Sequence, residues 1–187
     1  MKKEEFEKKY WNYYLMLEKR VMELEPYIAF DKSNYQTYSL RIMDLLISVC
    51  CEVESLFILI TKKAGNISSY LTFLNNDQFY SSVKNDLVNF QDIDILEPFK
   101  LNSKNQLEWW HSHNCLKHNR IKDFQTATFK NLINALAGLY LLEIYYYNQN
   151  YFKKDDTTVP EVESKLFKSD KIKSNIISPT SIICVEW

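Results

Sequence analysis

The sequence predicts an all-α fold, an antiparallel helical bundle of four to five main helices with an irregular C-terminal tail. Glycine is scarce, with two residues among 187, whereas the hairpins of a β protein usually need more. Long segments carry apolar residues at three- and four-residue steps, the period of a helix with one buried face. No proline interrupts residues 99 to 159, which favours long helices in the second half of the chain.

The first two helices are predicted at residues 3–25 and 40–63. In the first, the apolar stripe is Phe6, Tyr10, Tyr14, Leu17, Val21 and Leu24, and Pro26 ends it. Ser39 is a suitable N-cap for the second. Its apolar face consists of Ile42, Leu45, Leu46, Val49, Val53, Leu56 and Ile60. Since Ile47, Ile58 and Leu59 extend apolarity beyond that face, we expect this helix to lie centrally, and Gly65 and Asn66 to end it.

Signals are weaker between residues 66 and 108. NISSYLTFL and SSVKNDLVNF favour short helices, and DIDILEPFKLNSKNQ favours a loop. A helix over residues 107–119 and a longer one over 121–150 follow. The stripe of the longer helix is Phe124, Thr128, Leu132, Ala135, Leu139, Leu142 and Tyr146. The small residues Ala135, Ala137 and Gly138 predict a close approach to another helix.

The chain divides into a helical bundle domain, residues 1–152, and an irregular tail, residues 153–187, that packs on the bundle. The tail is polar, is punctuated by Pro160 and Pro179, and ends on the apolar ICVEW, for which we expect a short extended segment.

Composition and charge favour a reduced cytoplasmic protein. The net charge is −1, so RNA binding would need a local basic patch. MKKEEFEKKYW lacks the apolar core of a signal peptide, and the apolar run ALAGLYLL (135–142) is too short to span a bilayer, so we expect no membrane association. The cysteines show no disulfide-framework spacing: Cys50, Cys51, Cys115 and Cys184.

The segment WWHSHNCLKHNR, residues 109–120, holds all three histidines of the chain. If it is helical, Trp110, Asn114 and His118 share a face, and one interpretation is a polar seam of the core that the tryptophans anchor. A second is a metal site, because His111, Cys115 and His118 have spacing that permits three ligands on one side. No complementary Cys/His pair exists elsewhere, so we expect no bound metal and no cofactor.

The third interpretation is acid–base chemistry on a phosphodiester. Imidazole titrates near neutral pH, and Lys117 and Arg120 would supply positive charge where the transition state builds negative charge. On a helical wheel Glu54 falls among Ile47, Cys50, Phe57 and Ile58. A carboxylate in apolar surroundings needs a partner, for which Lys117, His118 and Arg120 are candidates. A purely structural ion pair between helices is the alternative for Glu54.

Three motifs together resemble a group of uncharacterised bacterial proteins that are similar to the HEPN superfamily. They are CEVE (Cys51 to Glu54), WW-x3-N-x2-KH-x-R (Trp109 to Arg120) and AT-x2-N-x3-ALA-x-L (Ala127 to Leu139). The resemblance covers roughly residues 35–145. It implies a four-helix bundle, usually dimeric, of the kind found in toxin–antitoxin, abortive-infection and CRISPR-associated phage-defence proteins. Many members of the superfamily are metal-independent endoribonucleases.

The superfamily motif is an arginine, often followed by a polar residue, then four to six residues and a histidine, and two motifs meet across the dimer. His118 carries over from it and Asn114 fits the polar residue, but His113 stands where the arginine is expected, so that role falls to Lys117 or Arg120.

We therefore expect a HEPN-like protein that cleaves or binds RNA, forms a homodimer and has a protein partner such as an antitoxin or defence component. The predicted catalytic residues are His118, Lys117, Arg120, Asn114 and Glu54, and the predicted substrate-binding residues are His113 and Trp110. The alternative is a non-catalytic binding or scaffolding protein of the same fold, whose polar cluster is structural.

Overall fold

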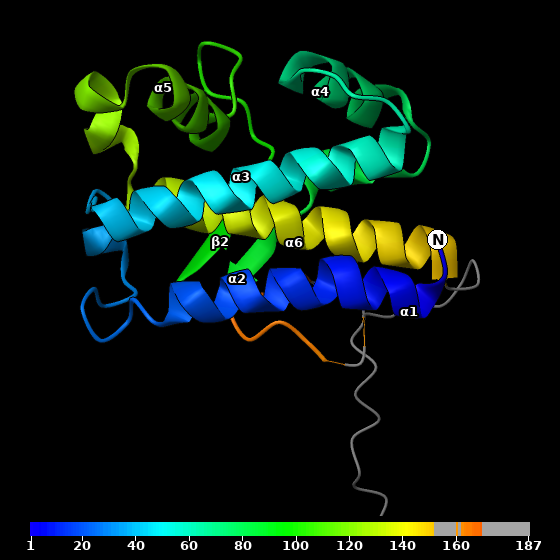
Figure 1. Ribbon diagram of the computed structural model, residues 1–187, viewed down its shortest axis with the longest axis horizontal. Helices are drawn as coiled ribbons and strands as arrows, with labels where there is room; N and C mark the ends of the chain where they lie inside the picture. Colours follow the sequence, from blue (N-terminus) through cyan, green and yellow to red (C-terminus); the bar gives the residue numbers. More distant parts are fainter. Residues whose placement is uncertain (152–159, 161, 170–187) are drawn as a thin grey trace, which may run out of the picture.

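Three long helical segments lie alongside one another along the long axis of the computed structural model, and α4 and α5 cover them at the top of Figure 1. The chain is mainly helical, which confirms the predicted fold class. The structure describes residues 1–151, 160 and 162–169. Its α-helices and strands are α1 (Lys3–Phe6), α2 (Asn12–Met22), α3 (Leu40–Thr61), α4 (Ile67–Asn76), β1 (Val88–Phe90), β2 (Asp94–Leu96), α5 (Glu108–Asp123), α6 (Phe129–Tyr151) and β3 (Phe167–Lys168).

The long helices do not all alternate in direction. α3 and α6 begin at the same end, where the backbone N–H of Phe129 donates to the carbonyl oxygen of Thr37 at 2.8 Å. At the other end, the hydroxyl of Tyr151 donates to the carbonyl oxygen of Met1 at 3.3 Å. α2 is therefore antiparallel to both, as predicted, whereas α3 and α6 run parallel because residues 62–128 carry the chain back to its starting end.

The centre of the bundle is α6. Every residue from 135 to 147 is buried, so neighbours surround this helix on all sides. The sequence predicted a central position for residues 40–63. α3 does contact α2, α4, α5 and α6, but Ile58 is 39% exposed and Cys51 is also exposed, so one face of α3 meets solvent.

The first predicted helix contains an extra residue. A π-helical turn, Glu7–Trp11, joins α1 to α2. It buries Phe6, Trp11 and Tyr14 and leaves Tyr10 half-buried, so the predicted stripe of regular helical spacing is wrong at this turn. A π turn adds one residue to a turn of helix and so shifts the phase of the side chains that precede it.

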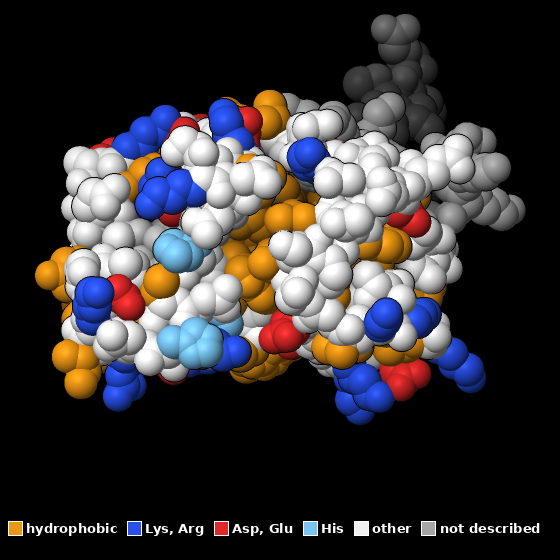
Figure 2. Space-filling view, turned by 90° about the horizontal axis from the view of Figure 1, so that it is seen from above, with side chains coloured by type: hydrophobic (Ala, Val, Ile, Leu, Met, Phe, Trp, Pro, Cys, Tyr) orange, Lys and Arg blue, Asp and Glu red, His pale blue; other side chains and the backbone are white. Residues whose placement is uncertain are grey.

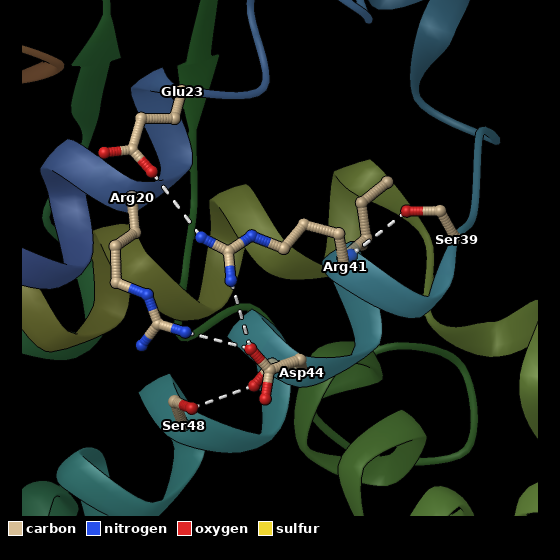
Figure 3. A network of polar contacts seen from close by, with 7 residues as sticks. Arg20, Glu23, Ser39, Arg41, Asp44 and Ser48 are labelled. Atoms are coloured by element: carbon tan, nitrogen blue, oxygen red, sulfur yellow. Dashed lines mark hydrogen bonds and ion pairs between the residues drawn. The ribbon is translucent and has the colours of Figure 1, made fainter.

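α3 begins where Ser39 predicts, since the Ser39 hydroxyl oxygen accepts the backbone N–H of Ile42 at 3.1 Å. Figure 3 shows how this end of α3 is joined to α2. Arg20 donates to Asp44 at 2.9 Å, and Arg41 lies 3.5 Å from both Asp44 and Glu23. The helix ends at Thr61, with Lys62 in the left-handed conformation, two residues before the predicted end at residue 63.

The region of weak signals contains one predicted helix and a small sheet. NISSYLTFL forms α4, which the Asn66 side chain caps. SSVKNDLVNF, predicted as a helix, forms a 3-10 turn (Tyr80–Asn85) and β1 instead, and part of the predicted loop forms β2. The sheet order is β2-β1-β3, with Val88 opposite Leu96 and Phe90 opposite Phe167. A hairpin forms here without glycine, because Gln91 and Asp92 adopt positive φ angles of 47° and 58°.

The last long helix begins later than predicted. Residues 121–128, assigned from the sequence to the helix over 121–150, form the end of α5 and a 3-10 turn (Phe124–Thr126). The side chains of Ser112 and Asn131 both donate to the carbonyl oxygen of Thr126, at 2.7 and 2.9 Å, and fix this connection. The predicted close approach is present: a Cβ atom on Gly138 would lie 3.4 Å from the Trp109 ring.

Part of the predicted tail crosses α2 in an extended conformation. The indole N–H of Trp11 donates to the carbonyl oxygen of Val162 at 2.7 Å, and β3 pairs with β1. The predictions for Pro179, Cys184 and the terminal ICVEW lie outside the described residues. Cys50, Cys51 and Cys115 are free thiols.

Candidate functional site on helix α5

The helix that carries WWHSHNCLKHNR is held to the bundle by its first two turns. The Trp109 indole N–H donates to the carbonyl oxygen of Pro98 at 2.7 Å, and its ring lies against Gly138 of α6. Ser112 anchors the next turn through Thr126. Because these contacts fix the inner face of α5, the opposite face points to solvent.

The two predicted substrate-binding residues lie on the inner face. Trp110 is 7% exposed and His113 is 1% exposed, and their ring centroids are 5.4 Å apart. Burial, and after it the charge of Lys117, lowers the pKa of His113 to about 4, so this imidazole is neutral at neutral pH. Because both side chains are buried, neither is accessible to a substrate in this conformation. Trp110 anchors the helix as the polar-seam interpretation predicts, but the buried histidine is His113, whereas Asn114 and His118, the predicted seam residues, lie on the outer face.

The other two histidines lie on the outer face. His111, Asn114, Cys115 and His118 follow one another at i, i+3, i+4 and i+7, and none of the four is buried. Lys117 is exposed beside His118. Figure 2 shows histidine and basic side chains together on the part of this surface that α5 forms. The sequence had paired Asn114 and His118 with Trp110, but only the first two share the exposed face.

A break in the helix follows His118. Asn119 has φ −149° and ψ 64°, so the regular part of α5 ends there, and Arg120 and Lys122 project from a separate, exposed turn. The carbonyl end of a helix favours nearby cations. Three basic side chains and His118 thus gather within six residues, with Asp123 beyond them the nearest carboxylate in the chain.

Most of these charges have no carboxylate partner. Within the part of the chain that the structure describes, Lys117, His118, Arg120 and Lys122 form no ion pair or side-chain hydrogen bond. Both arginines of the α2–α3 network, by contrast, are neutralised by Glu23 and Asp44 (Figure 3). Unpaired cations on one surface are available to an anionic ligand.

Glu54 does not join this cluster. It lies half-buried on α3, and among the described residues it forms no hydrogen bond or ion pair with Lys117, His118 or Arg120. The structure therefore brings Asn114, Lys117, His118 and Arg120 to one surface and leaves Glu54, Trp110 and His113 elsewhere.

Only two of the three side chains considered as metal ligands, His111 and Cys115, lie close together. The Cys115 sulfur lies 3.6 Å from Nε2 of His111, but in the described part of the chain no three His, Cys, Asp or Glu side chains are grouped as metal ligands. His118 does not complete a set with them.

A pocket of about 300 Å³, which was not predicted from the sequence, lies at the opposite end of α5. Its walls include Tyr35, Trp109, Lys130 and Asn134, together with β2 and residues 97–98 and 100–102. None of the predicted catalytic residues lines it. Its polar side chains largely bind one another, since Lys130 approaches Glu108 at 3.4 Å and Tyr35 donates to Asp94 at 2.9 Å.

Among the residues described, none of the helices combines the length and apolar character that crossing a bilayer would require. Comparison of the chain with protein-family models, with curated proteins and with solved structures finds no match in any of the three. The resemblance to the HEPN superfamily therefore stays a prediction from the sequence motifs.

Proposed function

We propose that the protein binds RNA on the exposed face of α5 and cleaves it there without a metal ion, as a homodimer. One observation carries the proposal: His118, Lys117 and Arg120 are all exposed on the same end of α5 and bind no carboxylate among the described residues. A phosphodiester provides the negative charge that such a surface lacks. The setting in a toxin–antitoxin or phage-defence system, with a protein partner, comes only from the HEPN-like resemblance.

The proposed reaction is an attack of the ribose 2′-oxygen on the adjacent phosphorus. Neutral His118 accepts the proton of the 2′-hydroxyl, the new P–O bond forms, and Lys117 and Arg120 stabilise the negative charge on the phosphorane oxygens. The bond from phosphorus to the 5′-oxygen then breaks, and that oxygen takes a proton from the protonated His118 of the second copy. The products are a 2′,3′-cyclic phosphate and a free 5′-hydroxyl.

RNA binding without cleavage is the second candidate, and a specific observation favours it. No described residue forms a hydrogen bond with the imidazole of His118, whereas a catalytic imidazole is usually oriented by one. In this form of the proposal His118 only contacts the RNA.

Replacing His118 with alanine tests the cleavage. With total RNA in EDTA, we expect wild type to produce 2′,3′-cyclic phosphate ends and His118→Ala to lose about a hundredfold or more of that rate. His111→Ala is the matched control, because His111 lies on the same exposed face of the same helix. Equal rates for wild type and His118→Ala would overturn the catalytic role, and no cleavage by wild type would leave binding as the function.

Replacing the cations tests the binding separately. We expect the double variant Lys117→Gln/Arg120→Gln to bind a single-stranded RNA oligonucleotide about tenfold more weakly. The slope of log affinity against log salt concentration should become less steep by roughly 1.4, because two phosphate contacts are lost. Lys62→Gln/Lys63→Gln removes two exposed lysines at the far end of α3 and should change neither quantity. If both double variants weaken binding equally, the α5 surface is not the RNA site.

A further inference from the structure

We propose that an apolar patch at the end of the bundle, formed by Tyr38, Leu40, Ile121 and Phe124, docks an acidic polypeptide segment that carries apolar anchor side chains. We call these four residues the end patch. The proposal concerns a protein partner and does not rest on the proposed RNA chemistry.

The side chains of the end patch are unusually exposed for apolar residues. Ile121 is 97% exposed, Leu40 is 69% exposed and Tyr38 is 49% exposed. An isoleucine normally lies among the most buried residues of a protein. Ile121 makes almost no contact with its own chain, so its side chain contributes little to the stability of this fold.

The four residues come from two segments that the backbone holds together. The rings of Tyr38 and Phe124 meet edge to face, with centroids 5.5 Å apart, and Tyr38 pairs with Thr128 in an isolated β-bridge. Leu40 is the first residue of α3, two positions after Tyr38, and Ile121 lies one helical turn before Phe124. The patch is thus a feature of the folded structure and not of a single segment.

The break at Asn119 explains why Ile121 faces solvent. On an uninterrupted α5, residue 121 would share a face with Trp110 and Leu107, which are buried. The non-helical backbone at Asn119 turns it outward.

Cations outnumber carboxylates beside Ile121, where Asp123 is the one acidic residue in the sequence from 117 to 124. Arg120 and Lys122 flank Ile121, Lys117 lies in the preceding turn, and none of them has a carboxylate partner among the described residues. On the other side, Arg41 follows Leu40 but is neutralised by Glu23 and Asp44 (Figure 3). A complementary partner would therefore carry apolar side chains with carboxylates along one side of them.

Other occupants fit less well. A second copy docked symmetrically on the end patch would bring the cations of both copies into one interface, without the RNA phosphates that lie between them in the proposed homodimer. An anionic bilayer would meet the carboxylates of Glu23 and Asp44 as well as the cations. RNA bases stack on aromatic rings, but Phe124 is half-buried against Tyr38, and the two most exposed residues of the patch, Ile121 and Leu40, are aliphatic.

The test uses a fluorescent peptide of sequence EELFDDLFEEL as the probe, with its charge-inverted counterpart KKLFKKLFKKL. We expect wild type to bind the acidic peptide and not the basic one, and Ile121→Ser to weaken the binding about tenfold or more. Ile95→Ser is the matched control, since Ile95 is 54% exposed on β2 and lies outside the end patch. Arg120→Glu/Lys122→Glu should abolish the binding by reversing the charge while leaving the apolar residues in place.

Several outcomes would overturn the proposal. These are no binding of the acidic peptide, equal weakening by Ile121→Ser and Ile95→Ser, or a selective effect of Ile121→Ser on self-association, on phosphatidylserine vesicles or on RNA in place of the peptide. RNA binding by the same preparations, tested with His118→Ala, reports on the proposed function separately, because His118 lies outside the end patch.

Discussion

The Glu18→Ala variant is expected to be less stable than wild type by about 2–4 kcal/mol. Glu18 is 2% exposed on α2, and its carboxylate accepts the hydroxyl protons of Tyr14 and Ser164 and the backbone N–H groups of Lys165 and Leu166. Alanine would leave these donors without their acceptor, and each buried unsatisfied group costs about 1–3 kcal/mol unless water replaces the lost partner. Because Ser164 is half-buried and Lys165 is exposed, water can replace part of the lost acceptor, and the total stays below the sum.

Chemical unfolding measures the loss of stability, and hydrogen exchange locates it. We expect the amides of Lys165 and Leu166 to exchange faster in Glu18→Ala, because they bind this carboxylate in wild type. Glu5→Ala is the control, since Glu5 forms an exposed ion pair with Lys9 at 2.7 Å, and such a pair is worth about 0–1 kcal/mol. Unchanged exchange at Lys165 and Leu166 would show that Glu18 does not hold this segment.

The Glu143→Gln variant is expected to be more stable than wild type at alkaline pH, by about 1–3 kcal/mol. Glu143 is 0% exposed in the middle of α6, and neither carboxylate oxygen has a hydrogen-bond partner among the described residues. Burial, and after it the charge of Glu52 on α3, raises its pKa well above the usual 4.5. Glutamine has nearly the same shape and cannot ionise.

The sign of the pH dependence follows from this raised pKa. The folded protein keeps the proton of Glu143 at pH values where the unfolded chain releases it, so stability is greatest below about pH 4.5 and falls as the pH rises toward the folded pKa. Glu52, whose pKa burial raises to about 7, acts in the same direction between 4.5 and 7. His113 acts in the opposite direction between about 4 and 6.5, because its folded pKa is lowered.

Urea unfolding of both proteins between about pH 5 and about pH 8 isolates the contribution of Glu143. We expect stability to fall more steeply with pH in wild type than in Glu143→Gln, while His113 contributes equally to both. Parallel pH profiles would mean that Glu143 is ionised in the folded protein. Glu52→Gln, which removes the neighbouring charge, should lower the pKa of Glu143 and give an intermediate profile.

Helices were predictable from the sequence wherever one apolar stripe ran without interruption. α3 and α4 begin at the side-chain caps Ser39 and Asn66, which are local signals. The hairpin of β1 and β2 was not predictable in this way, because its turn uses Gln91 and Asp92 where glycine or asparagine is usual. β1 also depends on Phe167, distant in sequence, and a contact of that range leaves no local pattern.

The site was predictable as a segment but not as a surface. Clustering of histidines pointed to residues 109–120, yet helical spacing alone placed Trp110 with Asn114 and His118, and the structure buries the tryptophan. The break at Asn119 decides which residues after His118 face solvent, and asparagine in a polar run gives no sign of it. The exposure of Ile121 was therefore not predictable. The burial of Glu18 and Glu143 was not predictable either, because acidic residues on a helix are usually solvated.

The π-helical turn at Glu7–Trp11 gives the N-terminal helix two different contact faces. Before the turn, Phe6 stacks on Tyr146 with ring centroids 4.8 Å apart, at the end of α6. At the last residue of the turn, Trp11 donates its indole N–H to the carbonyl oxygen of Val162. Because of this extra residue, one continuous helical segment contacts both the end of α6 and the chain at Val162. A chain shortened by one residue here would have to give up one of these two contacts.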